Sequence, residues 1–383
     1  MSETIKSFRD LAMEKKIRVL VTDDSALMRK KISDLINSDP ECETIATARN
    51  GEEALKVIST LKPDVVTLDL EMPKLDGVTA LKYIMSEWPT PVVILTGYSK
   101  YQGKETIRCL EYGAVDLVMK PDGPVSVGLE PIREELLAKI KAAAQASLHI
   151  LRPKFFESRS QEKKLTSLLQ TSTKVVAIAS STGGPRALVE VLPKLPAALT
   201  AGILVIQHMP GGFTRSMAER LSQECAISVK EAEDGEPLKE GAAYIAPGGF
   251  HMKVASDHQS PILKLEKGPA GHGLSPSADL AMKSLAPLFG NKSMGVVLTG
   301  MGNDGVEGLR EIKRYGGFTV AQDRRTSIVY GMPKAAVDAN VVDRVVAIDQ
   351  VAGEIIQWVK KEERTALSGQ RISYREKGVS VKR

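Results

Sequence analysis

Acidic, hydroxyl and basic side chains recur at the ends of apolar runs in the first 120 residues. Asp23 and Asp24 follow the first run, Asp69 lies near the end of the third, and Thr96 and Lys120 end the next two. Three carboxylates in one pocket repel one another unless a cation joins them, and such oxygen-rich sites suit Mg²⁺. Lys120 can neutralise phosphate charge and Thr96 can donate a hydrogen bond to it. Each residue alone is typical of a solvated loop, but together they predict a magnesium and phosphate site.

A second set of residues has the types needed for nucleophilic catalysis. Ser181 lies in a glycine-rich turn after an apolar run, and His208 and Asp304 follow two later runs. A serine hydroxyl is a weak nucleophile until an oriented base takes its proton. The helix predicted after the turn presents N–H groups that could stabilise an oxyanion. Such a turn is also typical of a phosphate cradle, although neither GxGxxG nor GxxxxGK[ST] occurs in it.

The elements that must position the first set alternate between apolar runs and amphipathic stretches. Strands are predicted at 17–22, 43–48, 65–70, 91–97 and 115–120, and helices near 25–38, 52–61, 79–87, 101–112 and 131–147. This alternation predicts a parallel sheet that is covered on both faces. Ligands of such sheets bind at the carboxyl ends of the strands, where the polar residues lie.

The second set belongs to a similar alternation that restarts after a polar segment. The segment 148–173 predicts a linker, with a short helix over 161–170. Strands are then predicted at 175–180, 202–207, 242–247, 251–256, 261–266, 294–300 and 318–322, and helices near 184–192, 213–223, 277–289, 304–315 and 350–361. The spacing over 242–266 favours an antiparallel excursion. The remainder predicts a second doubly wound α/β domain.

The net charge of +5 lies in one segment of the chain. The predicted organisation is a lead-in (1–16), a first domain (17–147), the linker, a second domain (174–363) and a tail (364–383) that we expect to be disordered. The tail holds six Lys or Arg and one acid, which leaves 46 basic and 46 acidic residues elsewhere. Because a nucleic-acid-binding domain needs a basic body, this composition disfavours that function. No helix-turn-helix pattern follows the first domain.

The remaining composition indicates a cytoplasmic protein. No run of 18 uncharged apolar residues is present, and the N-terminus lacks the apolar segment of a secretory signal. Cys42, Cys109 and Cys225 form no CxxC pair, which favours free thiols in a reducing compartment. The five histidines form no HExxH pair, so metal-dependent hydrolysis is disfavoured.

Residues 17–147 resemble the response-regulator receiver family. The motifs that carry this resemblance are DD (23–24), DLEMPKLDG (69–77), LTG (95–97) and MKP (119–121). The resemblance implies a flavodoxin-like fold in which a partner histidine kinase phosphorylates Asp69. It also implies a Mg²⁺ site made by Asp23, Asp24, Asp69 and the carbonyl of Glu71.

The same resemblance assigns Thr96 and Lys120 to the conformational switch of the domain. Receivers commonly have an aromatic residue three positions before the lysine, and this chain has Leu117 there. The coupled movement of hydroxyl and aromatic side chain is therefore expected to differ, while phosphorylation is not affected.

The second domain resembles the chemotaxis protein-glutamate methylesterase family. The matching segments are SSTGGP (180–185), QHMPGGFTRSMAERL (207–221), YIAPGGFHM (244–252), SPSADLAM (275–282) and LTGMGNDG (298–305). The resemblance implies hydrolysis of glutamate methyl esters on chemoreceptors, with release of methanol and no cofactor. Many members of the family also deamidate receptor glutamines.

Carried over by position, the family implies a Ser-His-Asp triad. Ser181 is the nucleophile because it immediately precedes Thr-Gly-Gly, although Ser180 is a close neighbour. His208 is the general base and then the acid, and Asp304 orients it. The oxyanion donors implied are the backbone N–H groups of Thr182 and Met301.

The family further implies that the unphosphorylated receiver restricts access to the esterase and that phosphorylation relieves this restriction. We expect a monomer with an intramolecular domain interface. An alternative of a different class is a phosphorylation-controlled module that binds a nucleotide or phosphate at residues 180–184 and has no esterase activity.

Overall fold

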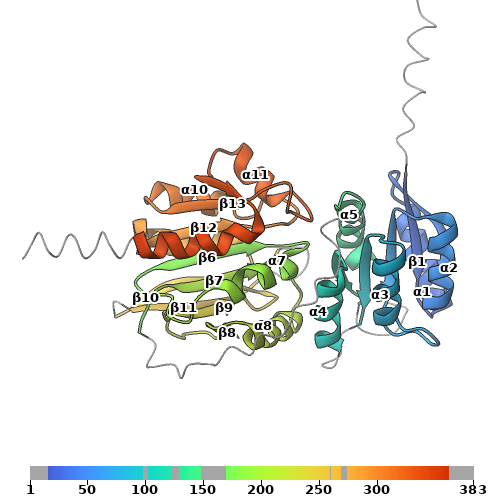
Figure 1. Cartoon of the computed structure of the whole chain (residues 1–383), viewed down its shortest axis with the longest axis horizontal. Helices are drawn as coiled ribbons and strands as arrows, with labels where there is room; N and C mark the ends of the chain where they lie inside the picture. Colours follow the sequence, from blue (N-terminus) through green and yellow to red (C-terminus); the bar gives the residue numbers. More distant parts are fainter. Residues whose placement is uncertain are drawn as a thin grey trace, which may run out of the picture. The chain divides into compact units, whose positions relative to one another are not determined.

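The computed structural model describes residues 16–97, 102–121, 129–147, 170–258, 260–268 and 274–361 of the 383-residue chain. The chain divides into two compact units, residues 1–155 and 156–383, each built around its own sheet (Figure 1). The expected lead-in, basic tail and short linker helix lie almost entirely outside the described residues. Among the helices within them, none is both long and apolar enough to cross a membrane.

The first unit contains a five-stranded parallel sheet in the order β2-β1-β3-β4-β5. Its strands are β1 Ile17–Thr22, β2 Cys42–Ala48, β3 Val65–Asp69, β4 Val92–Thr96 and β5 Asp116–Met119. Every residue of β3 and β4 is buried, as in a parallel sheet that is covered on both faces. The strand order reverses between β1 and β3, which is where ligands bind in sheets of this kind.

Short polar residues cap the first three helices of this unit. The helices are α1 Ala26–Asn37, α2 Gly51–Leu61, α3 Gly77–Glu87, α4 Gln102–Tyr112 and α5 Arg133–Ala144, the last preceded by the 3₁₀ turn η1 Glu130–Ile132. Ser25, Asn50 and Asp76 each accept a hydrogen bond from the backbone N–H three residues later. Such N-caps satisfy donors that would otherwise be orphaned and fix the helix start.

The second unit contains a seven-stranded sheet in the order β14-β13-β12-β6-β7-β9-β8, and all of its strands are parallel. Its strands are β6 Val175–Ser180, β7 Gly202–Gln207, β8 Ser228–Glu231, β9 Ala242–Ile245, β12 Ser293–Val297, β13 Phe318–Gln322 and β14 Arg344–Val346. The order reverses between β6 and β12. The carboxyl ends of these two strands therefore flank the expected binding crevice.

The helices of the second unit are α7 Gly184–Val191, α8 Phe213–Glu224, α9 Ala278–Phe289, α10 Val306–Arg314, α11 Met332–Asp338 and a helix over 348–361, with the 3₁₀ turns η2 Leu192–Lys194 and η3 Gly290–Lys292. An antiparallel hairpin, β10 Phe250–Asp257 and β11 Ser260–Lys267, forms a separate two-stranded sheet.

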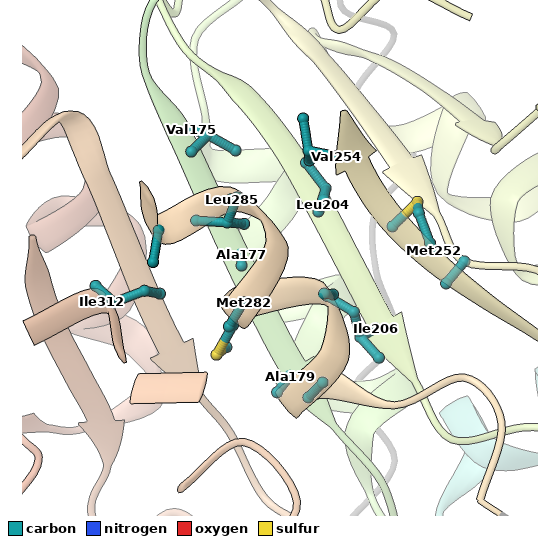
Figure 2. Packing of buried hydrophobic residues seen from close by; sticks show 14 of the residues in the cluster. Val175, Ala177, Ala179, Leu204, Ile206, Met252, Val254, Met282, Leu285 and Ile312 are labelled. Carbon is teal, nitrogen blue, oxygen red and sulfur yellow. The ribbon is translucent and has the colours of Figure 1, made fainter. Parts of the chain in front are cut away.

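A continuous apolar core joins the sheet to α9, α10 and the hairpin. Met282 and Leu285 of α9 lie over the small side chains Ala177 and Ala179 of β6 (Figure 2). Both α9 residues are fully buried, so Leu285→Ala would lower the free energy of unfolding by about 2–5 kcal/mol. At Gly308 a Cβ atom would lie 2.6 Å from Cβ of Met282, so only glycine allows α10 to approach α9 this closely.

Most of the predicted elements are confirmed, but the antiparallel excursion is smaller than expected. The strand predicted at 242–247 is β9, which pairs in parallel with β7 and β8, so among the strands described the antiparallel pair is β10 and β11. The short elements β8, β14 and α11 did not emerge from the sequence. Ser172, expected in the linker, is buried in the second unit, where its hydroxyl accepts a hydrogen bond from the N–H of Gly202.

The three cysteines are free and buried, in agreement with the sequence. Burial raises the pKa of Cys42 to about 11 and that of Cys109 and Cys225 to about 12. Because the thiolate is the reactive form, these residues are poor nucleophiles at neutral pH.

Candidate functional sites

The acidic set of the first unit converges at one edge of its sheet. Asp23 follows β1, Asp69 ends β3, Thr96 ends β4, and Lys120 follows β5. These strands are consecutive neighbours in the sheet. The backbone N–H of Lys120 also donates a 2.8 Å hydrogen bond to the carbonyl of Thr96, which ties the last two ends together.

Lys120 is the electrostatic centre of this site. Its Nζ donates hydrogen bonds of 2.7 Å to Oδ2 of both Asp23 and Asp69, which are almost completely buried. Burial raises the pKa of Asp69, and the charge of Lys120 opposes that rise. Burial alone would lower the pKa of Lys120, but the charges of the two aspartates hold it above its usual value. Lys120 therefore stays protonated between two carboxylates.

The donor set at this edge fits a magnesium ion. Asp23, Asp24 and Asp69 offer carboxylate oxygens that all lie within 4.8 Å of one another, and Asp24 is exposed to solvent. The N–H of Glu71 donates a 3.4 Å hydrogen bond to Oδ1 of Asp69, so the backbone at Glu71 lies beside that carboxylate. An all-oxygen set with an open, hydrated side is what Mg²⁺ prefers.

The loop after Asp69 is held close to the strand end by a glycine. The N–H of Gly77 donates to the carbonyl of Leu70 at 3.0 Å, and a Cβ atom on Gly77 would lie 2.1 Å from the carbonyl oxygen of Asp69. No other residue fits without moving the backbone of Asp69. Thr96 and Leu117 are buried, and Leu117 occupies the position where an aromatic residue is common.

The second set lies at the carboxyl ends of three adjacent strands. Ser181 follows β6, which lies between β7, followed by His208, and β12, whose loop carries Asp304. Gly183 adopts a φ of 78°, which glycine reaches without strain, and this conformation turns the chain from β6 into α7. The turn leaves Ser181 half-buried, whereas both of its neighbours are fully buried.

His208 and Asp304 form a hydrogen-bonded pair. Nε2 of His208 lies 2.9 Å from Oδ2 of Asp304. Because an ionised carboxylate only accepts, Nε2 carries the proton and Nδ1 is the nitrogen that is left to act as a base. Among the described side chains, no hydrogen bond joins His208 to the hydroxyl of Ser181. Such bonds are often long without substrate and tighten in the complex.

Asp304 is held by the N-terminus of α9. Its two oxygens accept hydrogen bonds from the Ser277 hydroxyl (3.0 Å) and the N–H groups of Ala278 (2.6 Å) and Asp279 (3.0 Å). Burial alone would raise the pKa of Asp304, but the His208 hydrogen bond, the charge of His208 and these N–H donors hold it below its usual value. Asp304 is therefore an ionised, rigidly oriented acceptor.

Asp279 makes the reciprocal contact. Its Oδ1 accepts hydrogen bonds from the N–H groups of Gly305 (2.9 Å) and Gly308 (2.7 Å) at the start of α10. Burial raises the pKa of Asp279, those two N–H groups oppose the rise, and the nearby charge of Asp304 adds to it. Asp304 thus caps α9, the helix that contains Asp279, and Asp279 caps α10, the helix that follows Asp304.

Ser180 and Ser181 differ sharply in surroundings. The Ser180 hydroxyl is fully buried and donates a 2.6 Å hydrogen bond to Oε1 of Gln207. Ser181 is partly accessible, and its N–H donates to the carbonyl of Thr299 at 3.1 Å. A substrate can therefore reach the Ser181 hydroxyl but not that of Ser180.

The backbone around the expected oxyanion donors lies against Ser181. A Cβ atom on Gly300 would lie 2.7 Å from Cβ of Ser181, so the loop that continues into Met301 touches the serine. The Thr299 hydroxyl donates to the carbonyl of Thr182 at 3.0 Å, which fixes the turn on the other side. The roles of Thr182 and Met301 remain predictions.

Gln207, Ser277 and Asp279 were missed at the sequence level. Gln207 lies in the motif segment 207–221, next to His208, and Ser277 and Asp279 lie in the motif segment 275–282, which was the available signal. Polar residues at the start of the predicted helix 277–289 could also have been expected to bind a carboxylate across the crevice.

The comparisons with known proteins cover both units. Residues 19–126 match the response regulator receiver domain model, and residues 176–355 match the CheB methylesterase model. A protein-glutamate methylesterase/protein-glutamine glutaminase from Pyrococcus abyssi is 46% identical over 90% of this chain and 94% of its own length.

A protein of the same name from Halalkalibacterium halodurans is 43% identical to this chain, over 91% of this chain and 100% of its own length. The crystal structure of the Thermotoga maritima CheB methylesterase catalytic domain is 41% identical, covers 48% of this chain and 97% of its own, and has a TM-score of 0.47. The identity to the two full-length relatives shows that the chain belongs to the CheB family of protein-glutamate methylesterases/protein-glutamine glutaminases.

Proposed function

We propose that this protein hydrolyses glutamate methyl esters on chemoreceptors, and that phosphorylation of its receiver domain activates the reaction. The observation that supports the chemistry most directly is the 2.9 Å bond between His208 and Asp304, one strand away from an accessible serine. The names of the relatives supply protein glutamate methyl esters as the substrate class, and the resemblance of the sequence to the chemotaxis methylesterases supplies the chemoreceptor.

In the acylation step, the Ser181 hydroxyl attacks the ester carbonyl carbon while Nδ1 of His208 takes its proton. The developing imidazolium is stabilised by Asp304, whose pKa is held low by its donors. The negative charge on the former carbonyl oxygen is received by the N–H groups of Thr182 and Met301. Collapse of the intermediate expels methoxide, which leaves as methanol with the proton from His208.

In the deacylation step, a water molecule gives its proton to His208 and attacks the acyl-Ser181 carbonyl. The serine leaves with that proton, and the product is a glutamate carboxylate on the receptor. The same steps applied to a glutamine side chain would release ammonia in place of methanol. The glutaminase part of the relatives' names favours this as a second activity of the same site.

The receiver domain supplies the control. Asp69 would accept the phosphoryl group from a histidine kinase, with Mg²⁺ held by Asp23, Asp24, Asp69 and the carbonyl of Glu71. Bound Mg²⁺ neutralises charge on the phosphoryl oxygens. Lys120 already lies at hydrogen-bonding distance from Asp69 and offers a further positive charge, while Thr96 provides a hydroxyl at the next strand end. We expect the active protein to be a cytoplasmic monomer.

A nucleotide- or phosphate-binding module is the alternative function, and the residues of the second site do not favour it. A phosphate cradle needs N–H groups and a cation, but it has no use for a histidine oriented by a partly buried carboxylate. The His208–Asp304 pair is the arrangement that general-base catalysis needs.

The test is methanol release from methylated receptor, with and without Mg²⁺ and a small acyl-phosphate donor. Wild type, Ser181→Ala, Ser180→Ala and Asp69→Ala would be compared, with circular dichroism as a check on folding. We expect release that rises with the donor, falls by at least about 10³-fold in Ser181→Ala, and loses its donor response in Asp69→Ala. The Ser180→Ala variant should retain readily measurable release.

No release from any form would remove the esterase assignment. Loss in Ser180→Ala together with retention in Ser181→Ala would move the nucleophile by one residue. Tight nucleotide binding that survives in Ser181→Ala would favour the alternative module.

A further inference from the structure

A buried glutamine joins the nucleophile turn to the residue that follows the next strand. Gln207 is the last residue of β7 and is 2% exposed. Its Nε2 donates to the carbonyl of Ser181 at 2.9 Å and to the carbonyl of His208 at 3.1 Å. Its Oε1 accepts from the Ser180 hydroxyl at 2.6 Å. The two carbonyls can only accept, so the amide orientation is determined by its partners.

The surrounding backbone is shaped to admit this side chain. A Cβ atom on Gly184, the first residue of α7, would lie 2.0 Å from Oε1 of Gln207. The N–H of Gly184 also donates to the carbonyl of Ser181 at 2.7 Å, and the N–H of His208 donates to the carbonyl of Ser180 at 3.0 Å. One amide therefore contacts the end of β6, the end of β7 and the start of α7.

We propose that Gln207 is a positioning residue for the esterase reaction and that its amide fixes the separation of Ser181 and His208. This inference rests on the proposed function of these two residues. Proton transfer from the serine requires the base within hydrogen-bonding reach, and a displacement of about 1 Å can cost about 10²-fold in rate. Both residues have their backbone carbonyls bound by the same Nε2, so neither can shift without breaking or stretching one of these bonds.

The chain offers a matched control. Gln322 is also a buried glutamine that ends a strand, β13. Its Oε1 accepts from the N–H of Thr299, and its Nε2 donates to the carbonyl of Thr326. It thus bridges two loop segments and, within the described part of the chain, makes no hydrogen bond to Ser181 or His208 itself. Its contact with the nucleophile turn is indirect, because the carbonyl of Thr299 accepts from the N–H of Ser181. Loss of either amide removes a comparable number of buried hydrogen bonds, so the two substitutions separate positioning from stability.

The experiment compares Gln207→Met, Gln322→Met and Ser180→Ala in the full-length protein. Steady-state methanol release gives kcat and KM, labelling by a small serine-directed sulfonyl fluoride reports the reactivity of Ser181, and thermal unfolding gives Tm. We expect Gln207→Met to lower kcat about 10²-fold, with KM within about twofold, and to slow labelling in parallel. Gln322→Met should lower Tm by a similar amount with a much smaller loss of kcat and of labelling rate.

Ser180→Ala removes only the bond to Oε1 and leaves both Nε2 bonds in place, so it keeps the test decisive if Gln207→Met fails to fold. We expect a loss of kcat of about threefold to tenfold, which is intermediate between wild type and loss of the whole amide. Equal losses of kcat in the two glutamine variants, or a kcat unchanged by both Gln207→Met and Ser180→Ala, would overturn the positioning role. Failure of the proposed function gives a different result, because then either no form releases methanol or release persists in Ser181→Ala.

Discussion

Replacement of Asp304 by asparagine tests how much the second site depends on one carboxylate. The two oxygens of Asp304 accept from four donors: the His208 ring and the Ala278 N–H on Oδ2, and the Ser277 hydroxyl and the Asp279 N–H on Oδ1. Asparagine has one acceptor oxygen and one NH₂ group. In either orientation, its NH₂ group faces two donors.

The structure sets the expected magnitudes. If the NH₂ group faces His208, the imidazole turns to the wrong tautomer, and the same change in a serine protease triad lowers kcat by about 10⁴-fold. That factor corresponds to about 5.4 kcal/mol of transition-state stabilisation. If the NH₂ group replaces Oδ1, the N–H of Asp279 loses its acceptor, which lowers the free energy of unfolding by about 1–3 kcal/mol. We expect the Asp304→Asn variant to lose both activity and stability, because in each orientation of the amide the NH₂ group faces two donors.

The assay is methanol release at saturating methylated receptor, combined with urea unfolding. Asp279→Asn is the matched control, because Oδ1 of Asp279 accepts both of its hydrogen bonds and the amide oxygen of asparagine can retain them. We expect that control to lose less than about tenfold in kcat. A loss for Asp304→Asn below about tenfold, or equal losses in the two variants, would refute the orienting role of Asp304.

The stability difference between wild type and Asp304→Asn should also depend on pH. The pKa of Asp304 is lower in the folded protein than its usual value of about 3.9. Its ionisation therefore adds stability that is fully present above about pH 4 and is lost as the pH falls through the folded-state pKa. Asparagine does not titrate, so the difference should shrink in acid. A difference that grows as the pH is lowered would contradict the depressed pKa.

Three further predictions concern the receiver domain. Lys120→Met leaves the buried carboxylates of Asp23 and Asp69 without their cation, so the free energy of unfolding in urea should fall by about 3 kcal/mol. Added Mg²⁺ should raise the stability of this variant more than that of wild type. An equal rise in both proteins would contradict a site shared by Lys120 and Mg²⁺. Asp69→Asn should abolish the increase in methanol release caused by an acyl-phosphate donor; a retained increase would place phosphorylation elsewhere. Gly77→Ala adds a Cβ atom 2.1 Å from the carbonyl oxygen of Asp69, so the free energy of unfolding should fall by about 1–3 kcal/mol and calorimetry should show a clear drop in Tm. An unchanged Tm would mean that the loop between Asp69 and Gly77 can move to make room for the methyl group.

Strand ends were the part of this fold that could be predicted best from the sequence. Buried parallel strands are continuous apolar runs, so the apolar pattern alone assigns Asp69 and Lys120 to strand ends. Because all parallel strands point the same way, the polar residues after them had to share an edge. The same logic brought Ser181, His208 and Asp304 to one edge of the second sheet, although their catalytic roles remain predictions.

Contacts made across the chain could not be predicted in the same way. Gln207 reads as the polar end of an apolar run, and nothing local shows that its amide spans two carbonyls. The partners of Asp279 lie 26 and 29 residues later in the chain, so its capping role depends on how α9 packs against α10. Strand β9 was assigned to an antiparallel unit because sequence spacing indicates neighbours along the chain and not the parallel partners β7 and β8.

The reciprocal capping of α9 by Asp304 and of α10 by Asp279 has a consequence for attempts to transplant this active site. Asp304 lies in the loop before α10, from which it contacts His208, and it is oriented by the N–H groups at the start of α9. A graft of the serine turn, the histidine strand and the aspartate loop onto another α/β scaffold would therefore leave Asp304 without its N–H donors. The smallest transferable unit includes both helix starts, together with Gly308, which lets the two helices meet.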